Sequence, residues 1–234
     1  MFLNNSMKSL IDCLLNFFYP RLCHVCGELL VGGENLFCMG CLYHLPRTGY
    51  HKNRDNPVAE LFWGRVRVVA ATAFFQYEKG SVYQDLIHKM KYKGYREIGT
   101  VLGMYLGADL KESDGFSSVD CIIPVPLHPK KERKRGYNQS EWIARGIAKS
   151  MGKPMQVGNL VRISESSTQT RKSRIERWEN VQRIFAVRYP ERIAGKHVLL
   201  VDDVVTTGAT LEACSSVLLE TEGVRVSIAT LAVA

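Results

Sequence analysis

The pattern of hydrophobic and polar positions changes near Arg65 in this 234-residue chain. From there on, short apolar runs alternate with segments whose apolar residues recur every three or four positions. That order is typical of strands and helices in a parallel sheet, so the predicted fold class is α/β. The expected strands cover residues 66–77, 119–125, 198–201 and 226–233, and the expected helices cover residues 82–90, 98–110, 139–151 and 211–220.

Residues 1–46 lack this alternation. An amphipathic helix is expected over residues 6–18, which are too few to span a bilayer and contain Asp12. Packing on the rest of the protein is favoured over lying on a membrane surface. No small-residue cleavage site follows, which disfavours a signal peptide and favours a cytoplasmic protein. The predicted organisation is a helix and cysteine module over 1–46, a polar linker over 47–64 and a main domain over 65–234.

Four of the seven cysteines form two Cys-x-x-Cys pairs, which are eleven residues apart. The pairs are Cys23 with Cys26 and Cys38 with Cys41. Four thiolates suit tetrahedral Zn²⁺, and a site with four protein ligands would be structural. Two disulfides are the alternative, which a cytoplasmic location disfavours. His24 and His44 lie beside the pairs as alternative ligands.

Residues 198–210 combine an apolar run, two adjacent carboxylates and a loop rich in Thr and Gly. Ligands of open parallel sheets bind at the carboxyl ends of strands, and a loop entering a helix presents free N–H groups to an anion. Asp202 and Asp203 would repel a phosphate, so they are better suited to accept hydrogen bonds from sugar hydroxyls. The segment predicts a sugar-phosphate site in which five residues cradle the phosphate: Thr206, Thr207, Gly208, Ala209 and Thr210.

This segment resembles the motif with which type I phosphoribosyltransferases bind 5-phosphoribosyl 1-pyrophosphate (PRPP). The resemblance implies PRPP binding together with Mg²⁺, which would be held mainly by pyrophosphate and ribose oxygens. Purine-salvage members carry an Asp where this chain has Thr206. The chain is therefore more similar to the orotate and amido-transferring branches, and hypoxanthine or guanine salvage is disfavoured.

The net charge of +8 favours anionic partners, either PRPP or nucleic acid. A basic stretch over residues 127–139 directly follows an expected strand, and Arg135 within it is a candidate to stabilise departing pyrophosphate. A nucleic-acid contact and a solvated charged loop are the alternatives for this stretch. The candidate nucleic-acid contacts here and in the Tyr-rich segment 89–95 are Lys91, Lys93, Lys130, Lys131, Arg133 and Lys134.

Residues 162–180 form a long, polar and basic segment, which is typical of a lid or a binding loop. Closure over the substrate would bring Arg171 to the departing pyrophosphate as a second catalytic candidate. Trp178 is expected to anchor the loop, with stacking on a base as the alternative. A surface excursion without function is the other interpretation of the whole segment.

The ordered combination of motifs resembles the ComF competence-protein family (ComFC-like). The matching segments are 18–27, 90–94, 124–128, 135–139 and 168–170 with Arg177 and Asn180. The resemblance implies a type I phosphoribosyltransferase core with a small N-terminal zinc-ribbon-like module. It also implies a part in the uptake of transforming single-stranded DNA beside a competence helicase. Residues 171–173 depart from the family, which usually carries an apolar residue there.

Two hypotheses about activity follow. The leading one is a Mg²⁺-dependent phosphoribosyltransferase whose acceptor the sequence does not name. The rival is a non-catalytic nucleic-acid-binding module that retains the fold, since a fold alone does not establish an activity.

Overall fold

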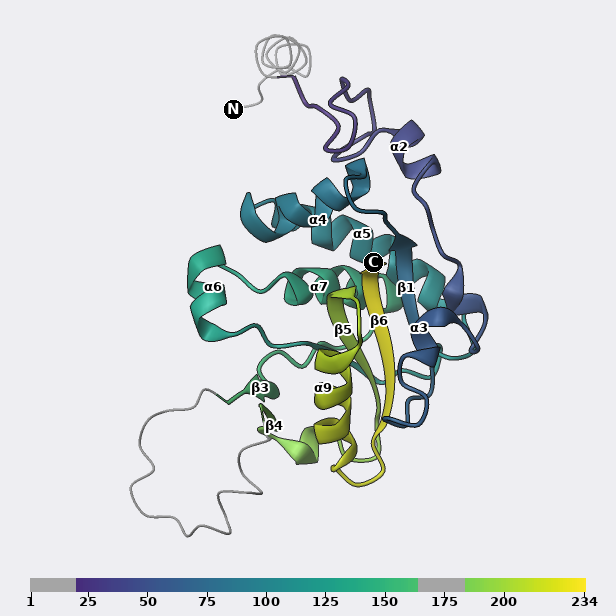
Figure 1. Ribbon diagram of the computed structural model, residues 1–234, viewed down its shortest axis with the longest axis vertical. Coiled ribbons are helices and arrows are strands. Elements are labelled where there is room, and N and C mark those ends of the chain that lie inside the picture. Colours follow the sequence, from purple (N-terminus) through teal and green to yellow (C-terminus); the bar gives the residue numbers. More distant parts are fainter. Residues whose placement is uncertain (1–19, 164–183) are drawn as a thin grey trace, which may run out of the picture.

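The computed structural model describes residues 20–163 and 184–234. Its central sheet has four parallel strands in the order β1-β6-β5-β2 (Figure 1). The strands are β1 (Ala71–Gln76), β2 (Cys121–Pro124), β5 (His197–Val205) and β6 (Arg225–Val233). A separate antiparallel pair joins β3 (Leu160–Arg162) to β4 (Phe185–Val187). The predicted parallel α/β core is confirmed, and the helix expected over residues 6–18 lies outside the described residues.

Helices cover both faces of the sheet (Figure 1). One face packs against α4 (Val82–Tyr92), α5 (Arg96–Lys111) and α7 (Gln139–Met151), and the other packs against α3 (Pro57–Glu60) and α9 (Ala209–Leu219). Leu199 of β5 belongs to the first core and Leu200 to the second. A strand buried on both faces needs apolar residues at successive positions, which explains the continuous run at 198–201.

Two strands differ from their expected bounds by more than two residues. β5 continues past 201 to Val205, because the backbone of these residues still pairs with β6 as far as Val233. β1 begins at Ala71 instead of residue 66. The residues before it form a loop in which only Val69 and Ala70 bond to the backbone of β6.

The basic stretch after β2, expected as a loop, contains a short helix, α6 (Pro129–Arg135). The His128 side chain accepts a hydrogen bond from the Lys130 N–H at 3.1 Å, and Pro129 occupies the first turn. Gly136 ends the helix in the left-handed conformation, with φ at 81°.

Residues 47–64, expected as a polar linker, pack into the main domain instead. Val58 and Phe62 are completely buried against the α9 face of the sheet. The buried Asn56 amide donates to the Ala71 carbonyl at 3.0 Å, and its oxygen caps α3. Thr48 donates its N–H to the Phe74 carbonyl, and Arg47 forms an antiparallel bridge with Phe75, so the start of this segment lies alongside β1.

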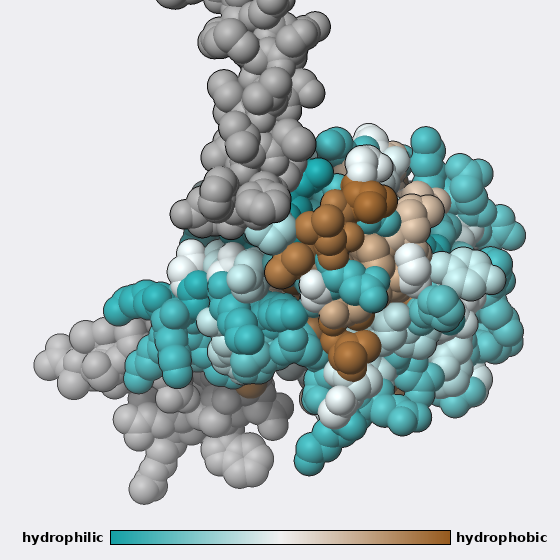
Figure 2. Space-filling view, turned by 90° about the horizontal axis from the view of Figure 1, so that it is seen from above, coloured by the Kyte–Doolittle hydropathy of each residue, from teal (hydrophilic) through white to brown (hydrophobic). Residues whose placement is uncertain are grey.

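The cysteine module, residues 20–46, lies at one end of the molecule against α4 (Figure 1). The Lys89 ammonium donates to the His24 carbonyl at 2.7 Å, and the Tyr83 hydroxyl donates to the Cys41 carbonyl at 3.2 Å. Figure 2 shows hydrophobic side chains on the surface at this end, and the module exposes Leu22 and Leu29. Among the described residues, no helix has the length and apolar character needed to cross a membrane.

Helices α5 and α7 are held in close contact by glycines. A Cβ on Gly103 would lie 2.3 Å from the Ile143 carbonyl oxygen, and one on Gly146 would lie 2.1 Å from the Thr100 carbonyl oxygen. Between the helices, the Ser150 hydroxyl also donates to the Met104 carbonyl at 2.7 Å. Because the atoms in the way are backbone atoms, neither helix can accept a methyl group here without moving.

Gly103→Ala and Gly146→Ala should each destabilise the protein by about 1–3 kcal/mol through overpacking. In a helix, alanine is normally more favourable than glycine by about 1 kcal/mol. A loss of stability on replacing either glycine by alanine would therefore indicate overpacking between the two helices. Urea unfolding measures it, with Gly32→Ala as the control because open space surrounds Gly32. Unchanged or increased stability in both helix variants would contradict the close contact.

Candidate functional site

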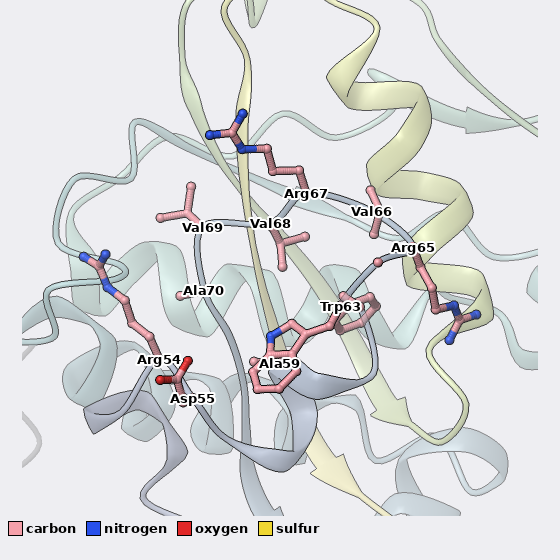
Figure 3. Close-up of a pocket in the computed structure, with 12 residues that line it drawn as sticks. Arg54, Asp55, Ala59, Trp63, Arg65, Val66, Arg67, Val68, Val69 and Ala70 are labelled. Atoms are coloured by element: carbon pink, nitrogen blue, oxygen red, sulfur yellow. The ribbon is translucent and has the colours of Figure 1, made fainter.

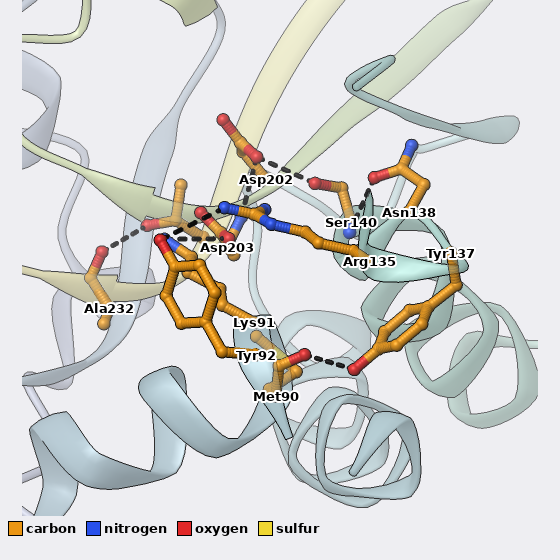
Figure 4. A network of polar contacts seen from close by, with 11 residues as sticks. Met90, Lys91, Tyr92, Arg135, Tyr137, Asn138, Ser140, Asp202, Asp203 and Ala232 are labelled. Atoms are coloured by element: carbon orange, nitrogen blue, oxygen red, sulfur yellow. Dashed lines mark hydrogen bonds and ion pairs between the residues drawn. The ribbon is translucent and has the colours of Figure 1, made fainter. Parts of the chain in front are cut away.

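The carboxylates of Asp202 and Asp203 lie near the carboxyl end of β5, and each has a partner from a different helix (Figure 4). Asp202 Oδ1 accepts hydrogen bonds from the Ser140 hydroxyl at 2.8 Å and from the Asp203 N–H at 2.9 Å. Asp203 Oδ2 forms an ion pair with the Lys91 ammonium at 3.0 Å. Strand β5 therefore brings α7 and α4 together at one edge of the sheet.

The two carboxylates differ in their electrostatics. Burial, followed by the charge of Asp203, raises the pKa of Asp202 from 3.8 to about 7, against the opposing effects of the Ser140 hydroxyl and Lys91. Lys91 neutralises Asp203 directly. Near neutral pH the pair thus carries less than its formal charge of two, which suits hydrogen bonding to hydroxyl groups better than binding a bare cation.

The loop after β5 leads into α9 and leaves backbone donors free. Gly208 precedes α9 in the left-handed conformation, with φ at 75°, and α9 has no side-chain N-cap. By contrast, Ser81 caps α4 and Asn138 caps α7. Residues 202 and 204–211 line a cavity of about 80 Å³ at this point. The N–H groups of the first turn of α9 are therefore available to an anion in that cavity.

Arg135 reaches the same edge from the end of α6 (Figure 4). Its guanidinium lies 5.1 Å from the centre of the Tyr92 ring and donates to the Tyr92 hydroxyl at 3.4 Å. Tyr92 follows Lys91 in α4. Arg135, the predicted pyrophosphate-binding cation, therefore contacts the same turn of α4 that supplies the ion-pair partner of Asp203. Arg171, the second catalytic candidate, lies outside the described residues.

The predicted nucleic-acid contacts do not all lie together. Lys91 points at Asp203, whereas Lys93 is exposed just beyond α4. The other four candidates are exposed on α6: Lys130, Lys131, Arg133 and Lys134.

Sequence reasoning did not identify Ser140 or the contact of Lys91 with the acid pair. Asn138, near the end of the basic stretch over residues 127–139, is buried and has a structural role: it caps α7 and donates to the Val125 carbonyl at 2.9 Å. Ser140 lies in the first turn of α7, and the basic stretch over residues 127–139 leads from β2 to that helix. This position at the start of the helix is the sequence signal that could have identified Ser140.

The four predicted metal ligands form one cluster. Cys23, Cys26, Cys38 and Cys41 place their sulfur atoms within 4.8 Å of one another, and Cys26 Sγ lies 3.8 Å from Cys38 Sγ. Tetrahedral zinc with Zn–S bonds of about 2.3 Å separates its sulfurs by about 3.8 Å, so the cluster fits the ion. Backbone N–H groups also donate to these sulfurs, as at Cys38 N to Cys23 Sγ, 3.4 Å.

The neighbouring histidines have other contacts. The His24 ring lies 4.7 Å from the Tyr95 ring, and His44 Nδ1 lies 2.8 Å from the Gly40 carbonyl. Within the described residues, the metal-ligand cluster consists of cysteines alone.

Comparison with known proteins agrees with this geometry. Residues 138–234 match the family model of the phosphoribosyl transferase domain. The chain is 30% identical over 146 residues to the DNA utilization protein YhgH of Salmonella typhimurium, covering 61% of this chain and 63% of that protein. It is 28% identical over 222 residues to competence protein F of Haemophilus influenzae, covering 88% of this chain and 93% of that protein.

Among solved structures, the chain is similar to the glutamine PRPP amidotransferase from B. subtilis. The identity is 24% and the TM-score 0.40, over 57% of this chain and 26% of that chain. The chain spans about 63% of the length of the YhgH proteins that it matches.

The strand, acid pair, loop and helix lie within the residues that match the phosphoribosyl transferase domain, and the predicted fold class is confirmed. This domain is joined to a four-cysteine cluster that fits a zinc module. The chain is also 31% identical over 99 residues to competence protein ComFC of Bacillus subtilis, covering 42% of this chain and 38% of that protein, so the resemblance that its motifs indicate is supported by similarity to two competence proteins.

Replacing Asp202 should reveal the cost of its buried charge. A carboxyl whose pKa is higher in the folded than in the unfolded protein contributes stability that is fully present below pH 3.8 and is lost as the pH rises through about 7. Asp202→Asn should therefore be more stable than the wild type at pH 8, by on the order of 2 kcal/mol. The difference should shrink as the pH falls toward 5.

Urea unfolding at both pH values measures this difference, with the exposed Asp114→Asn as the control. A pH-independent difference between Asp202→Asn and the wild type would contradict the raised pKa.

Metal analysis should find one zinc ion per chain. Cys26→Ser and Cys38→Ser should each lose most of the zinc, because a thiolate ligand is replaced by a hydroxyl, and should lower the melting temperature. His24→Ala and His44→Ala should keep full zinc content. Loss of zinc in either histidine variant, with retention in the cysteine variants, would overturn the four-cysteine assignment.

Proposed function

We propose that this protein binds PRPP with Mg²⁺ at the carboxyl edge of its sheet and supports phosphoribosyltransferase-type chemistry. The observation that carries the proposal is the single unit formed by β5, its acid pair and the uncapped start of α9. Hydroxyl-binding carboxylates and phosphate-binding N–H groups lie within one strand and the helix after it. A ribose 5-phosphate carries hydroxyl groups, which would bind the carboxylates, and a phosphate, which would bind the N–H groups.

In this proposal each part of the substrate has its own partners. The backbone N–H groups of residues 206–210 bind the 5-phosphate, and Asp202 and Asp203 accept hydrogen bonds from the ribose hydroxyls. As the anomeric bond breaks, positive charge develops on the ribose and negative charge on the departing pyrophosphate, which Arg135 stabilises. Arg171 is proposed for the same role from outside the described residues.

Bound together with PRPP, Mg²⁺ would neutralise part of the negative charge of the pyrophosphate. The chain's residues fit a metal held mainly by substrate oxygens, because Lys91 and Ser140 already contact the two carboxylates. A cavity of about 580 Å³ beside Lys91 and Tyr92 provides room for an acceptor next to the ribose.

The names of the relatives also support a proposal about the role of this protein in the cell. We propose a cytoplasmic role in handling single-stranded DNA during its uptake, beside a competence helicase. The names DNA utilization protein and competence protein F, both given to relatives of this chain, support that role. So does the exposed basic surface of α6.

That basic surface also favours a second candidate function, a non-catalytic nucleic-acid-binding module. Four exposed cations lie on α6, and Arg135 at the end of the same helix contacts the exposed Tyr92, so phosphates and bases would both have partners on this surface. Such binding should weaken steeply with salt, whereas PRPP binding should depend on Mg²⁺.

Calorimetric titration with PRPP, with and without Mg²⁺, tests the proposed function. We expect Mg²⁺-dependent binding that is lost in the Asp202→Asn/Asp203→Asn double variant, because asparagine does not offer the ribose hydroxyls a charged acceptor. Lys130→Gln/Lys131→Gln is the matched control, with two exposed charges removed outside the pocket, and should bind PRPP normally. Absence of binding with Mg²⁺ would favour the non-catalytic module.

A further inference from the structure

We propose that Arg65 is a positioning residue that fixes the phosphate-binding loop from behind. Its guanidinium donates to the Thr207 carbonyl at 3.0 Å and to the Leu61 carbonyl at 3.0 Å, and it forms an ion pair with Glu212. Arg65 thus joins the loop, the first turns of α9 and the segment after α3. This inference rests on the proposed function of the loop.

The contact with Thr207 follows from what the loop has to do. A loop that turns its N–H groups toward an anion turns carbonyl groups away from it, and those carbonyls need donors elsewhere. Thr207 lies in the middle of the loop, directly before Gly208. By donating to the Thr207 carbonyl, Arg65 holds that peptide group in one orientation.

The ion pair with Glu212 has an electrostatic effect. Glu212 lies in the first turn of α9, whose N-terminus is the proposed phosphate site. A carboxylate there would repel a bound phosphate and reduce the favourable effect of the helix dipole. Arg65 neutralises Glu212 through their ion pair.

Phe62 completes the support. Its ring atoms lie 3.1 and 3.3 Å from where a Cβ on Gly208 would stand, and Phe62 is completely buried. Gly208 therefore has no room to move toward α3. The segment expected as a linker supplies both Phe62 and Arg65 to the proposed site.

A matched control stands two residues along the chain. Figure 3 shows Arg65 reaching toward α9, whereas Arg67 points away from it across the mouth of a cavity of about 660 Å³. Both arginines are exposed, and among the described residues Arg65 forms an ion pair and side-chain hydrogen bonds whereas Arg67 forms neither. Arg65→Met and Arg67→Met remove the same charge, but only the first removes the loop contact.

The test compares binding of ribose 5-phosphate and of pyrophosphate to the full chain by calorimetry. Arg65→Met should bind ribose 5-phosphate about tenfold more weakly, the effect expected for losing a charged hydrogen bond, while its pyrophosphate affinity stays unchanged. Arg67→Met should match the wild type for both ligands. Arg65→Lys should recover part of the loss, because it keeps the charge near Glu212 but not the forked donor.

Hydrogen exchange separates this inference from the proposed function. The amides of residues 206–210 should exchange faster in Arg65→Met than in Arg67→Met, whether or not ligand binds. If the wild type binds neither ligand but this exchange difference appears, the proposed function fails while the positioning role stands. Equal exchange and equal affinities in the two variants would overturn the role of Arg65. An equal loss of affinity for both ligands in Arg65→Met, together with a large fall in melting temperature, would also overturn this role.

Discussion

The parallel pairing of β5 with β6 is the constraint on which the rest of this structure depends. It continues to Val205, four residues past the apolar run, and so places the carboxylates of Asp202 and Asp203 on the paired part of the strand. A strand that ended at Val201 would leave these acids in a loop, where their positions would be free to vary. Ser140 and Lys91 can contact these carboxylates because pairing with β6 holds the backbone of β5 in place.

One helix links the two modules of the chain. Lys89 of α4 contacts the cysteine module, whereas Lys91 of the same helix contacts Asp203. Only Met90 lies between these two residues, so a change in the position of the cysteine module and a change at the acid pair both act on the same short segment of α4. The glycine contact between α5 and α7 sets the position of Ser140 in a comparable way, since α7 carries that residue in its first turn.

The sequence predicts the core elements well, because both-face burial and helical spacing leave strong patterns: α7 was expected over its observed residues. The acid pair and phosphate loop were also evident, since chemistry and order coincide in one short segment. The packing of residues 47–64 was not, because a polar composition hides the buried Val58 and Phe62. Nor were the contacts of Lys91 and Arg65, which join residues far apart in the chain. The α6 helix was overlooked although His128, Pro129 and Gly136 are start and stop signals.

Amide chemical-shift mapping with ribose 5-phosphate tests the central claim most directly, because it reports where the ligand binds without assuming any activity. We expect the largest shifts on residues 206–210, with smaller ones at Asp202, Asp203 and Ser140. Shifts concentrated on α6 and Tyr92, with the β5–α9 loop unaffected, would contradict it and identify the basic surface as the anion-binding site.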